Sequence, residues 1–135
     1  MAKKTKSSIC FIYVTCPNPE TAERLAQHAV QEKLAACANI LPQMQSIYHW
    51  QGRIESAQET VLILKSQARL YKKVERRLLE LHPYDCPCIV QWPIEQGSSA
   101  YMDWIKSELK ATPQAQSRSA QHRSSHHPRK KLRSK

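Results

Sequence analysis

The first half of the chain alternates between apolar runs and polar breaks in a way that predicts a strand, a helix and a second strand. Residues 9–14 are a short, β-rich apolar run, which is typical of a central strand. Asn18 is placed to cap a helix that has Pro19 at its first position. Apolar residues then recur at helical spacing, and residues 33–36 close the predicted helix. Residues 37–41 form a compact apolar run, as expected of a buried strand.

A strand pair is predicted to follow. Residues 44–50 alternate between two kinds of side chain, which fits a strand with two different faces, and residues 51–52 supply a tight turn back into a pairing strand. Pro42 has no backbone donor, so the pair should bend or lie at a sheet edge there. Because an edge that carries Tyr48 and Trp50 is rarely left bare, these two residues are predicted to lie at an oligomer interface.

A second series of strand, helix and strand occupies the rest of the pattern. Residues 60–64 predict a strand core, and Ser66 is a plausible cap for a helix whose apolar positions run over 70–81. Residues 88–92 predict a fourth strand, and a short third helix should open at residues 97–98. The order contains two βαβ units joined by a hairpin. It predicts an α+β fold, a ferredoxin-like (βαβ)2 sandwich with a four-stranded antiparallel sheet, helices on one face and an added C-terminal helix.

The charge is concentrated at the two ends. Of the 21 basic residues, ten lie in residues 1–8 and 111–135, which contain no acidic residue, so the net charge of +10 belongs to these segments. We therefore divide the chain into a basic N-terminal extension (1–8), a neutral domain (9–110) and a basic tail (111–135) that is expected to be disordered. The tail could touch nucleic acid or an anionic membrane surface by charge alone.

Cysteine usage and hydropathy predict a cytoplasmic protein. No apolar run approaches membrane-spanning length, and no segment resembles a secretory signal. An odd number of cysteines without such a signal favours reduced thiols over a disulfide framework. The cysteines are Cys10, Cys16, Cys37, Cys86 and Cys88.

One cluster suggests chemistry, the segment from His82 to Cys88. Cys86 and Cys88 point to the same face of an extended segment, and two thiolates suit a soft metal such as Cu(I), with His82 as a further ligand. The alternative is that Cys88 simply packs in its strand. No glycine-rich phosphate loop is present, and nothing in the sequence activates Asp85 or Tyr84 as an acid or base, so we do not expect an enzyme.

Taken together, the motifs resemble the CutA divalent-cation tolerance proteins over residues 9–110. The matching pieces are 32–39 (EKLAACAN), 40–42 (ILP), 46–48 (SIY), Trp50, Gly52, 64–65 (LK), 82–84 (HPY), Pro87, Pro93, Tyr101 and Trp104. The resemblance implies a domain similar to the PII signalling proteins, a tight homotrimer whose second and third strands pair between subunits, and a role in tolerance of copper and other divalent metal ions without enzymatic activity.

The sequence departs from the family pattern at one position. The family usually has Pro-Glu where this chain has Pro87-Cys88, and a thiol there would shift preference toward soft metal ions. The first hypothesis is a trimeric protein that binds a metal ion or a small ligand. The alternatives are a trimeric scaffold that displays basic tails to nucleic acid or anionic membrane, and a thiol enzyme using Cys86 or Cys88.

Overall fold

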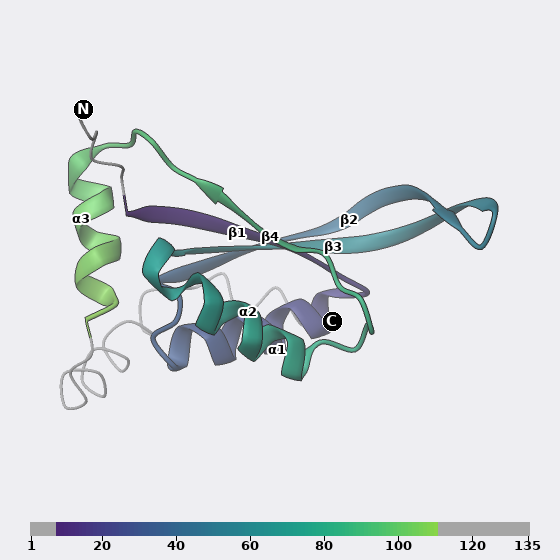
Figure 1. Cartoon of the computed structure of the whole chain (residues 1–135), viewed down its shortest axis with the longest axis horizontal. Helices are drawn as coiled ribbons and strands as arrows, with labels where there is room; N and C mark the ends of the chain where they lie inside the picture. The colour runs from purple at the N-terminus through teal and green to yellow at the C-terminus, as the bar shows by residue number, and fades with distance from the viewer. Residues whose placement is uncertain (1–7, 111–135) are drawn as a thin grey trace.

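A computed structural model of the chain describes residues 8–110 and shows a single sheet with three helices (Figure 1). The strand order is β2-β3-β1-β4, and all three neighbouring pairs are antiparallel. The strands are β1 (Ile9–Cys16), β2 (Cys37–Trp50), β3 (Arg53–Gln67) and β4 (Ile89–Pro93). The helices are α1 (Pro19–Gln31), α2 (Tyr71–Leu81) and α3 (Ser99–Glu108), with a 3-10 turn at Ala68–Leu70.

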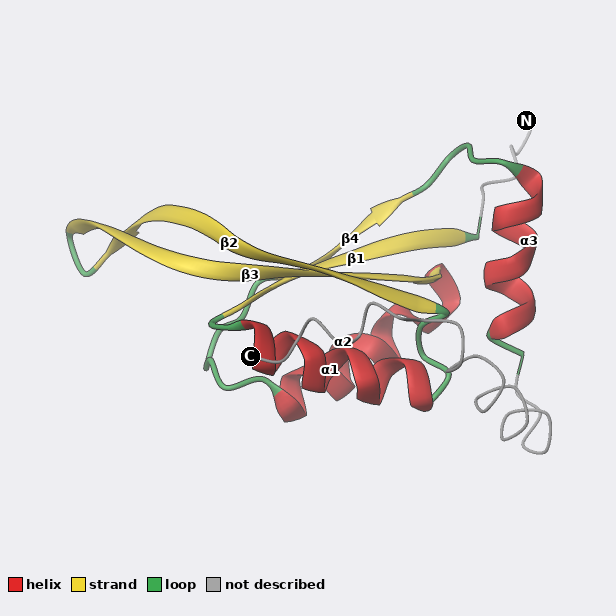
Figure 2. Ribbon diagram, turned by 180° about the vertical axis from the view of Figure 1, so that it is seen from behind, coloured by secondary structure: helices red, strands yellow, loops and turns green. Residues whose placement is uncertain are grey.

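The sheet has one covered face and one open face. Helices α1 and α2 lie together against the same face, whereas α3 stands at one end of the sheet, opposite the end where the β2–β3 hairpin projects (Figure 2). This arrangement confirms the predicted ferredoxin-like fold with an added third helix. The predictions for residues 1–7 and for the tail at 111–135 fall outside the described residues.

The core lies between the sheet and its two helices. Alternate residues of β1 face the helices and are fully buried, and they meet the alternate residues of β3 that point the same way. Helix α1 contributes the apolar side of an amphipathic pattern. Ile105 of α3 and Leu109, the residue that follows this helix, complete the core. The largest fully buried side chains include Ile9, Ile12, Leu25, Leu62, Leu64 and Leu78.

Helix α1 begins as predicted but ends earlier than predicted. The Asn18 side chain accepts a hydrogen bond from the Thr21 amide at 2.8 Å, and Pro19 is the first residue of the helix. The helix stops at Gln31 because Lys33 adopts a left-handed backbone conformation with φ of 61°. The amides of residues 34 and 35 then fold back onto one carbonyl of the last turn, that of Ala29. Residues 33–36 are therefore a C-terminal cap and not helix.

The segment that was expected to be a buried strand ended by Pro42 is part of a 14-residue edge strand. Within the described single chain, no residue of β2 is fully buried, because only β3 pairs with it. Pro42 does not end the strand. The pairing shifts between Leu41 and Met44, where Gln43 has φ of 67°, so a bulge absorbs the proline. At the tip, Gln51 and Gly52 both have positive φ, as a two-residue hairpin turn requires.

Ser66 is not a helix cap. It lies inside β3, fully buried, and its hydroxyl donates to the Leu34 carbonyl at 2.6 Å. The strand continues to Gln67, and α2 starts only after the 3-10 turn, with no side-chain cap of its own. Cys88 precedes β4, which begins at Ile89. No helix within residues 8–110 is long and apolar enough to cross a membrane.

Candidate functional site

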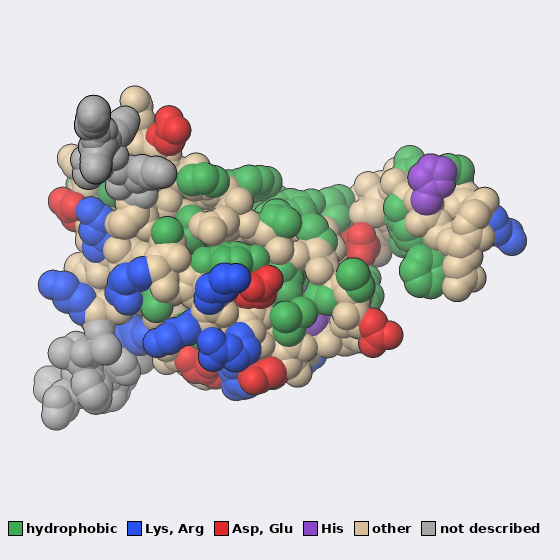
Figure 3. All heavy atoms as spheres, in the orientation of Figure 1, with side chains coloured by type: hydrophobic (Ala, Val, Ile, Leu, Met, Phe, Trp, Pro, Cys, Tyr) green, Lys and Arg blue, Asp and Glu red, His purple; other side chains and the backbone are tan. Residues whose placement is uncertain are grey.

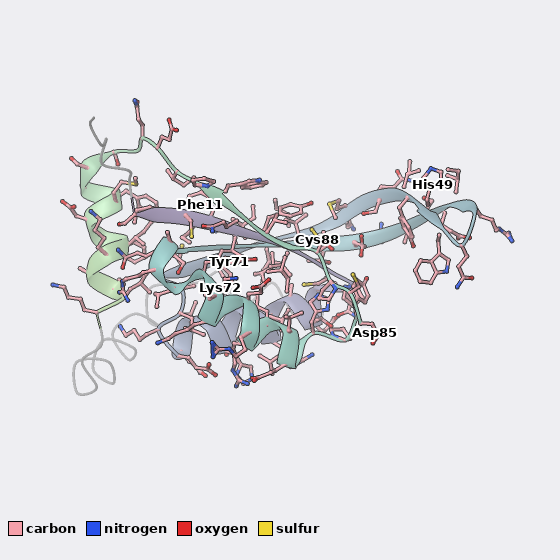
Figure 4. All side chains as sticks on the ribbon, in the orientation of Figure 1. Phe11, His49, Tyr71, Lys72, Asp85 and Cys88 are labelled. Atoms are coloured by element: carbon pink, nitrogen blue, oxygen red, sulfur yellow. The ribbon has the colours of Figure 1, made fainter. Side chains whose placement is uncertain are left out.

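The cysteine-containing segment, residues 82–88, is the loop that carries the chain from α2 to β4. It passes the end of β1, where the Thr15 amide donates to the Cys88 carbonyl at 3.4 Å. Figure 4 labels Asp85 and Cys88 along this loop, at the end of the sheet from which the hairpin projects. The loop therefore has a fixed start on α2 and a fixed end beside β1.

His82 is a buried anchor for this loop. Only 7% of its surface is exposed, and its Nε2 lies 2.9 Å from the Thr15 carbonyl, which can only accept a hydrogen bond. Its Nδ1 accepts a hydrogen bond from the Tyr84 amide at 3.1 Å. Both ring nitrogens are thus occupied, so in this conformation His82 has no lone pair left for a metal ion.

A tyrosine of the loop forms a hydrogen bond with a carboxylate of the sheet. The Tyr84 hydroxyl donates to Glu59 Oε2 at 2.8 Å, which joins the loop to β3. Burial, followed by this hydrogen bond and the charge of Glu59, raises the pKa of Tyr84. Sequence reasoning missed Glu59 because the contact depends on strand register: Glu59 pairs with Met44 across β2 and β3, and no local motif marks it.

The two candidate thiols of the loop are both exposed. Burial and the charge of Glu59 raise the pKa of Cys88, so its thiol keeps its proton more firmly than a free cysteine would. Cys16 is fully buried on the covered face, so it is not an accessible ligand, and burial, reinforced by Glu59, raises its pKa to about 12. Within residues 8–110, no group of three or more His, Cys, Asp and Glu side chains could hold a metal ion.

A second candidate surface is apolar and is formed by the hairpin and the open face of the sheet. On the hairpin, Tyr48 and Trp50 expose 42% and 57% of their surface, and Ile47 and Ile54 expose even more. The open face adds Leu41, Val90 and Trp92, with the Trp92 ring 5.2 Å from that of Tyr13. Figure 3 shows apolar side chains gathered along the upper side of the sheet and again on the projecting hairpin. Exposed apolar side chains gathered in this way often mark an interface.

Comparison with known families gives a clear result. The model of the family described as CutA1 divalent ion tolerance protein matches residues 10–108. The chain belongs to this family. Among curated relatives, the divalent-cation tolerance protein CutA of Thermus thermophilus is 41% identical over 95 residues, which cover 70% of this chain and 92% of the relative. The family match therefore spans nearly all of the described residues 8–110.

Longer relatives and solved structures agree with this assignment. The chloroplastic protein CutA of Arabidopsis thaliana is 40% identical over 109 residues, which cover 81% of this chain but 59% of the relative; the matched region likewise spans 55% of the mouse protein CutA. The crystal structure of CutA from Xylella fastidiosa superposes with a TM-score of 0.75 at 38% identity, covering 77% of this chain and all of that one. The structure of the periplasmic divalent cation tolerance protein CutA from Archaeoglobus fulgidus superposes with a TM-score of 0.73 at 39% identity, covering 76% of this chain and 99% of that one.

Proposed function

We propose that this CutA-family chain takes part in tolerance of divalent metal ions, as a homotrimer that binds copper or another soft metal ion through the loop at residues 82–88. The names of its relatives support the first part, because the proteins from Thermus thermophilus and Archaeoglobus fulgidus are divalent-cation tolerance proteins. The observation that carries the metal-binding part is the pair of exposed thiols at Cys86 and Cys88 on one short, anchored loop. The relatives' names include chloroplastic and periplasmic proteins, so a cytoplasmic location stays a prediction.

Within this proposal, His82 positions the loop and the two thiols bind the metal ion. A thiol ligates as a thiolate, so a metal ion must displace the protons of Cys86 and Cys88. Copper(I) prefers sulfur ligands and competes well for such thiolates. Because two thiolates are a small ligand set, a further ligand would come from a neighbouring subunit.

The proposed trimer is supported by the shape of the apolar surface. The hairpin projects beyond the body of the domain, and its strand β2 has hydrogen-bonded partners on one side only. An edge strand with exposed aromatic residues is a ready site for pairing with another chain. A second and third copy would cover both the hairpin and the open face of the sheet.

We propose binding without catalysis. Two groups of the loop hold their protons more firmly than usual: burial raises the pKa of Tyr84, and burial together with the charge of Glu59 raises that of Cys88. His82, the usual acid–base residue near neutral pH, is committed to two structural hydrogen bonds.

A copper(I) competition titration tests the proposed ligands. The full chain is titrated against a chromophoric chelator under reducing conditions, together with Cys86→Ser, Cys88→Ser and the double variant. Affinity should fall in each single variant and most in the double variant. Binding should weaken as the pH is lowered, because protons compete with the metal ion for the thiolates.

The matched control is Cys37→Ser. Cys37 is half-buried and is the first residue of β2, outside the loop at residues 82–88. Unchanged copper affinity in the double variant, measured on protein that melts like the parent, would refute the site. An equal loss in the Cys37 variant would show that thiols bind copper without regard to their place in the fold.

A further inference from the structure

The exposed side of α2, together with the 3-10 turn before it, carries four cationic side chains. Arg69, Lys72, Lys73 and Arg76 are all exposed, whereas Val74 and Leu78 on the other side of the helix are buried in the core. From residue 69 to residue 76 the patch extends roughly 10 Å along the axis. Figure 3 shows Lys and Arg side chains gathered over α2, and Figure 4 labels Lys72 on this helix. We call these four residues the basic face.

The basic face lacks the carboxylates that the chain supplies to a neighbouring cation. Arg77, on the same helix, forms ion pairs with Glu32 and with Glu80, both at 2.9 Å. Among residues 8–110, by contrast, no acidic side chain pairs with Lys72, Lys73 or Arg76. Arg69 makes one hydrogen bond, to the neutral amide of Gln67. Although Glu75 and Glu80 lie on the same helix, Lys72, Lys73 and Arg76 form no ion pair within residues 8–110 and stay exposed to a partner.

Neither helix stability nor overall composition explains this arrangement. The first turn of α2 holds no acidic residue, although the positive end of a helix favours acidic side chains and disfavours lysine. The domain as a whole is neutral, since the excess charge of the chain lies in residues 1–8 and 111–135. Residues that reduce the stability of the helix on which they lie commonly mark a functional surface.

We propose that the basic face binds the phosphate backbone of double-stranded nucleic acid without regard to sequence. About three successive phosphates of one strand lie within 10 Å of duplex, which matches the length of the basic face. Single strands usually need aromatic side chains for base stacking. The only aromatic residue of α2, Tyr71, instead donates its hydroxyl to the Ile89 carbonyl of β4 at 3.2 Å.

An anionic membrane is a poorer match for this surface. A helix that lies on a membrane inserts apolar side chains between its cations. The apolar side of α2 is already used against the sheet, and on the exposed side Leu79 is the one large apolar residue. The proposal also places the contact on the folded domain, at residues 69–76, and not on the basic tail.

Binding of the full chain to a labelled 20-base-pair DNA duplex, measured by fluorescence anisotropy at several salt concentrations, tests this proposal. The test variant is Lys72→Gln/Lys73→Gln/Arg76→Gln. The control, Arg53→Gln/Lys106→Gln/Lys110→Gln, removes the same charge from exposed positions elsewhere. A third variant, Arg129→Gln/Lys130→Gln/Lys131→Gln/Arg133→Gln, removes charge from the tail.

The test variant should bind at least tenfold more weakly at low salt than the parent. Its log–log salt slope should be smaller by about 2 to 3, because each lost phosphate contact removes about 0.9. The control should stay within about twofold of the parent in affinity. The three substituted side chains make no ion pair within residues 8–110, so the test variant should melt like the parent. If it does not, the single variant Arg76→Gln replaces it in the binding measurement.

Three results would overturn the proposal. Equal weakening in the test variant and the control would mean that net charge alone drives binding. Loss of binding only in the tail variant would assign the contact to residues 111–135. Loss of binding to phosphatidylserine vesicles in the test variant, with duplex binding unchanged, would identify a membrane surface instead.

Discussion

Two buried polar side chains, Ser66 and His82, each tie a loop to the sheet through hydrogen bonds. Ser66 donates to the carbonyl of Leu34 just after α1, and His82 joins Thr15 at the end of β1 to the backbone of Tyr84. A buried polar group is tolerated only when it is hydrogen-bonded, so both positions are tightly specified. These contacts fix where the chain leaves each helix.

Replacing Ser66 by alanine should destabilise the domain by about 1–3 kcal/mol, because the partly buried Leu34 carbonyl loses its donor. The control is Ser56→Ala, at an exposed position of the same strand, where the hydroxyl accepts one surface hydrogen bond from Gln45. That change should cost less than about 0.5 kcal/mol. Urea unfolding measures both, and equal midpoints for the two variants would contradict the role given to Ser66.

Thiol accessibility should separate the two buried cysteines from the two of the loop at residues 82–88. Burial raises the pKa of Cys10 to about 11 and that of Cys16 to about 12, so neither should react in the native state. Cys86 should react with Ellman's reagent before Cys88, whose pKa is raised. Mass spectrometry of partly labelled protein gives the order. Labelling of Cys16 in native protein at the rate of Cys86 would contradict the described core.

At the scale of elements, sequence patterns predicted the caps and turns that depend on neighbouring residues in the chain. They did not predict the strand bounds that depend on pairing in the sheet. Asn18 and Gly52 were correctly placed in a cap and a turn because their roles are local. Ser66 was misassigned because a serine before an apolar helical pattern looks the same whether it caps a helix or ends a strand. The full length of β2 was not predicted, because Pro42 indicated that the strand ends there. Only the pairing of β2 with β3 shows that a bulge accommodates the proline.

Part of the candidate site could likewise be predicted from local sequence, and part depends on contacts between distant residues. Cys86 and Cys88 could be found from their spacing, and the structure leaves both exposed. The two hydrogen bonds of His82 and the contact between Tyr84 and Glu59 join residues far apart in the chain, which no local pattern encodes. The sequence therefore indicated the loop but not how the loop is held.

One ion-pair network connects the two helices of the covered face. Arg77 of α2 contacts Glu32 at the end of α1, and the hydrogen bonds from its guanidinium lower the pKa of Glu32 below its usual 4.5. A lowered carboxyl pKa adds stability that is present above pH 4.5 and disappears as the pH falls through the folded-state value. This contribution should be seen at neutral pH and not in acid.

Glu32→Gln should therefore lower the melting temperature at pH 7, and its difference from the parent should shrink as the pH falls below 4.5. Differential scanning calorimetry across this range measures the effect. The control is Glu23→Gln, an exposed carboxylate of α1 without an ion pair, which should leave the melting temperature nearly unchanged. A Glu32→Gln difference that grows in acid would contradict the assigned sign.

At the scale of the whole molecule, the domain is lopsided. Helices cover one face of the sheet, and the other face and the hairpin expose apolar side chains (Figure 1). The described chain buries a core but leaves apolar side chains exposed on the open face and the hairpin, which is typical of an interaction surface. This imbalance supports the proposed homotrimer.

Trp50→Ala should weaken that assembly. An aromatic anchor at an interface contributes roughly 2 kcal/mol or more, which corresponds to about a thirtyfold rise in the dissociation constant. Sedimentation velocity over a dilution series measures the change. Leu79→Ala is the control, because Leu79 is 50% exposed but lies on the helical layer. A Trp50→Ala protein that remains fully assembled at low micromolar concentration would contradict the assigned interface.

The position of β1 in the sheet has a consequence for how the chain folds as it is made. Among the described strands β1 is synthesised first, yet it lies between β3 and β4, and its residue Cys10 pairs with Pro93. At about 5–20 residues per second, roughly 4–15 s separate the synthesis of Cys16 from that of Pro93. During that interval the β2–β3 hairpin can close locally, whereas the apolar β1 waits for its second neighbour. The nascent chain is therefore most exposed to aggregation and to chaperones before residue 93 emerges.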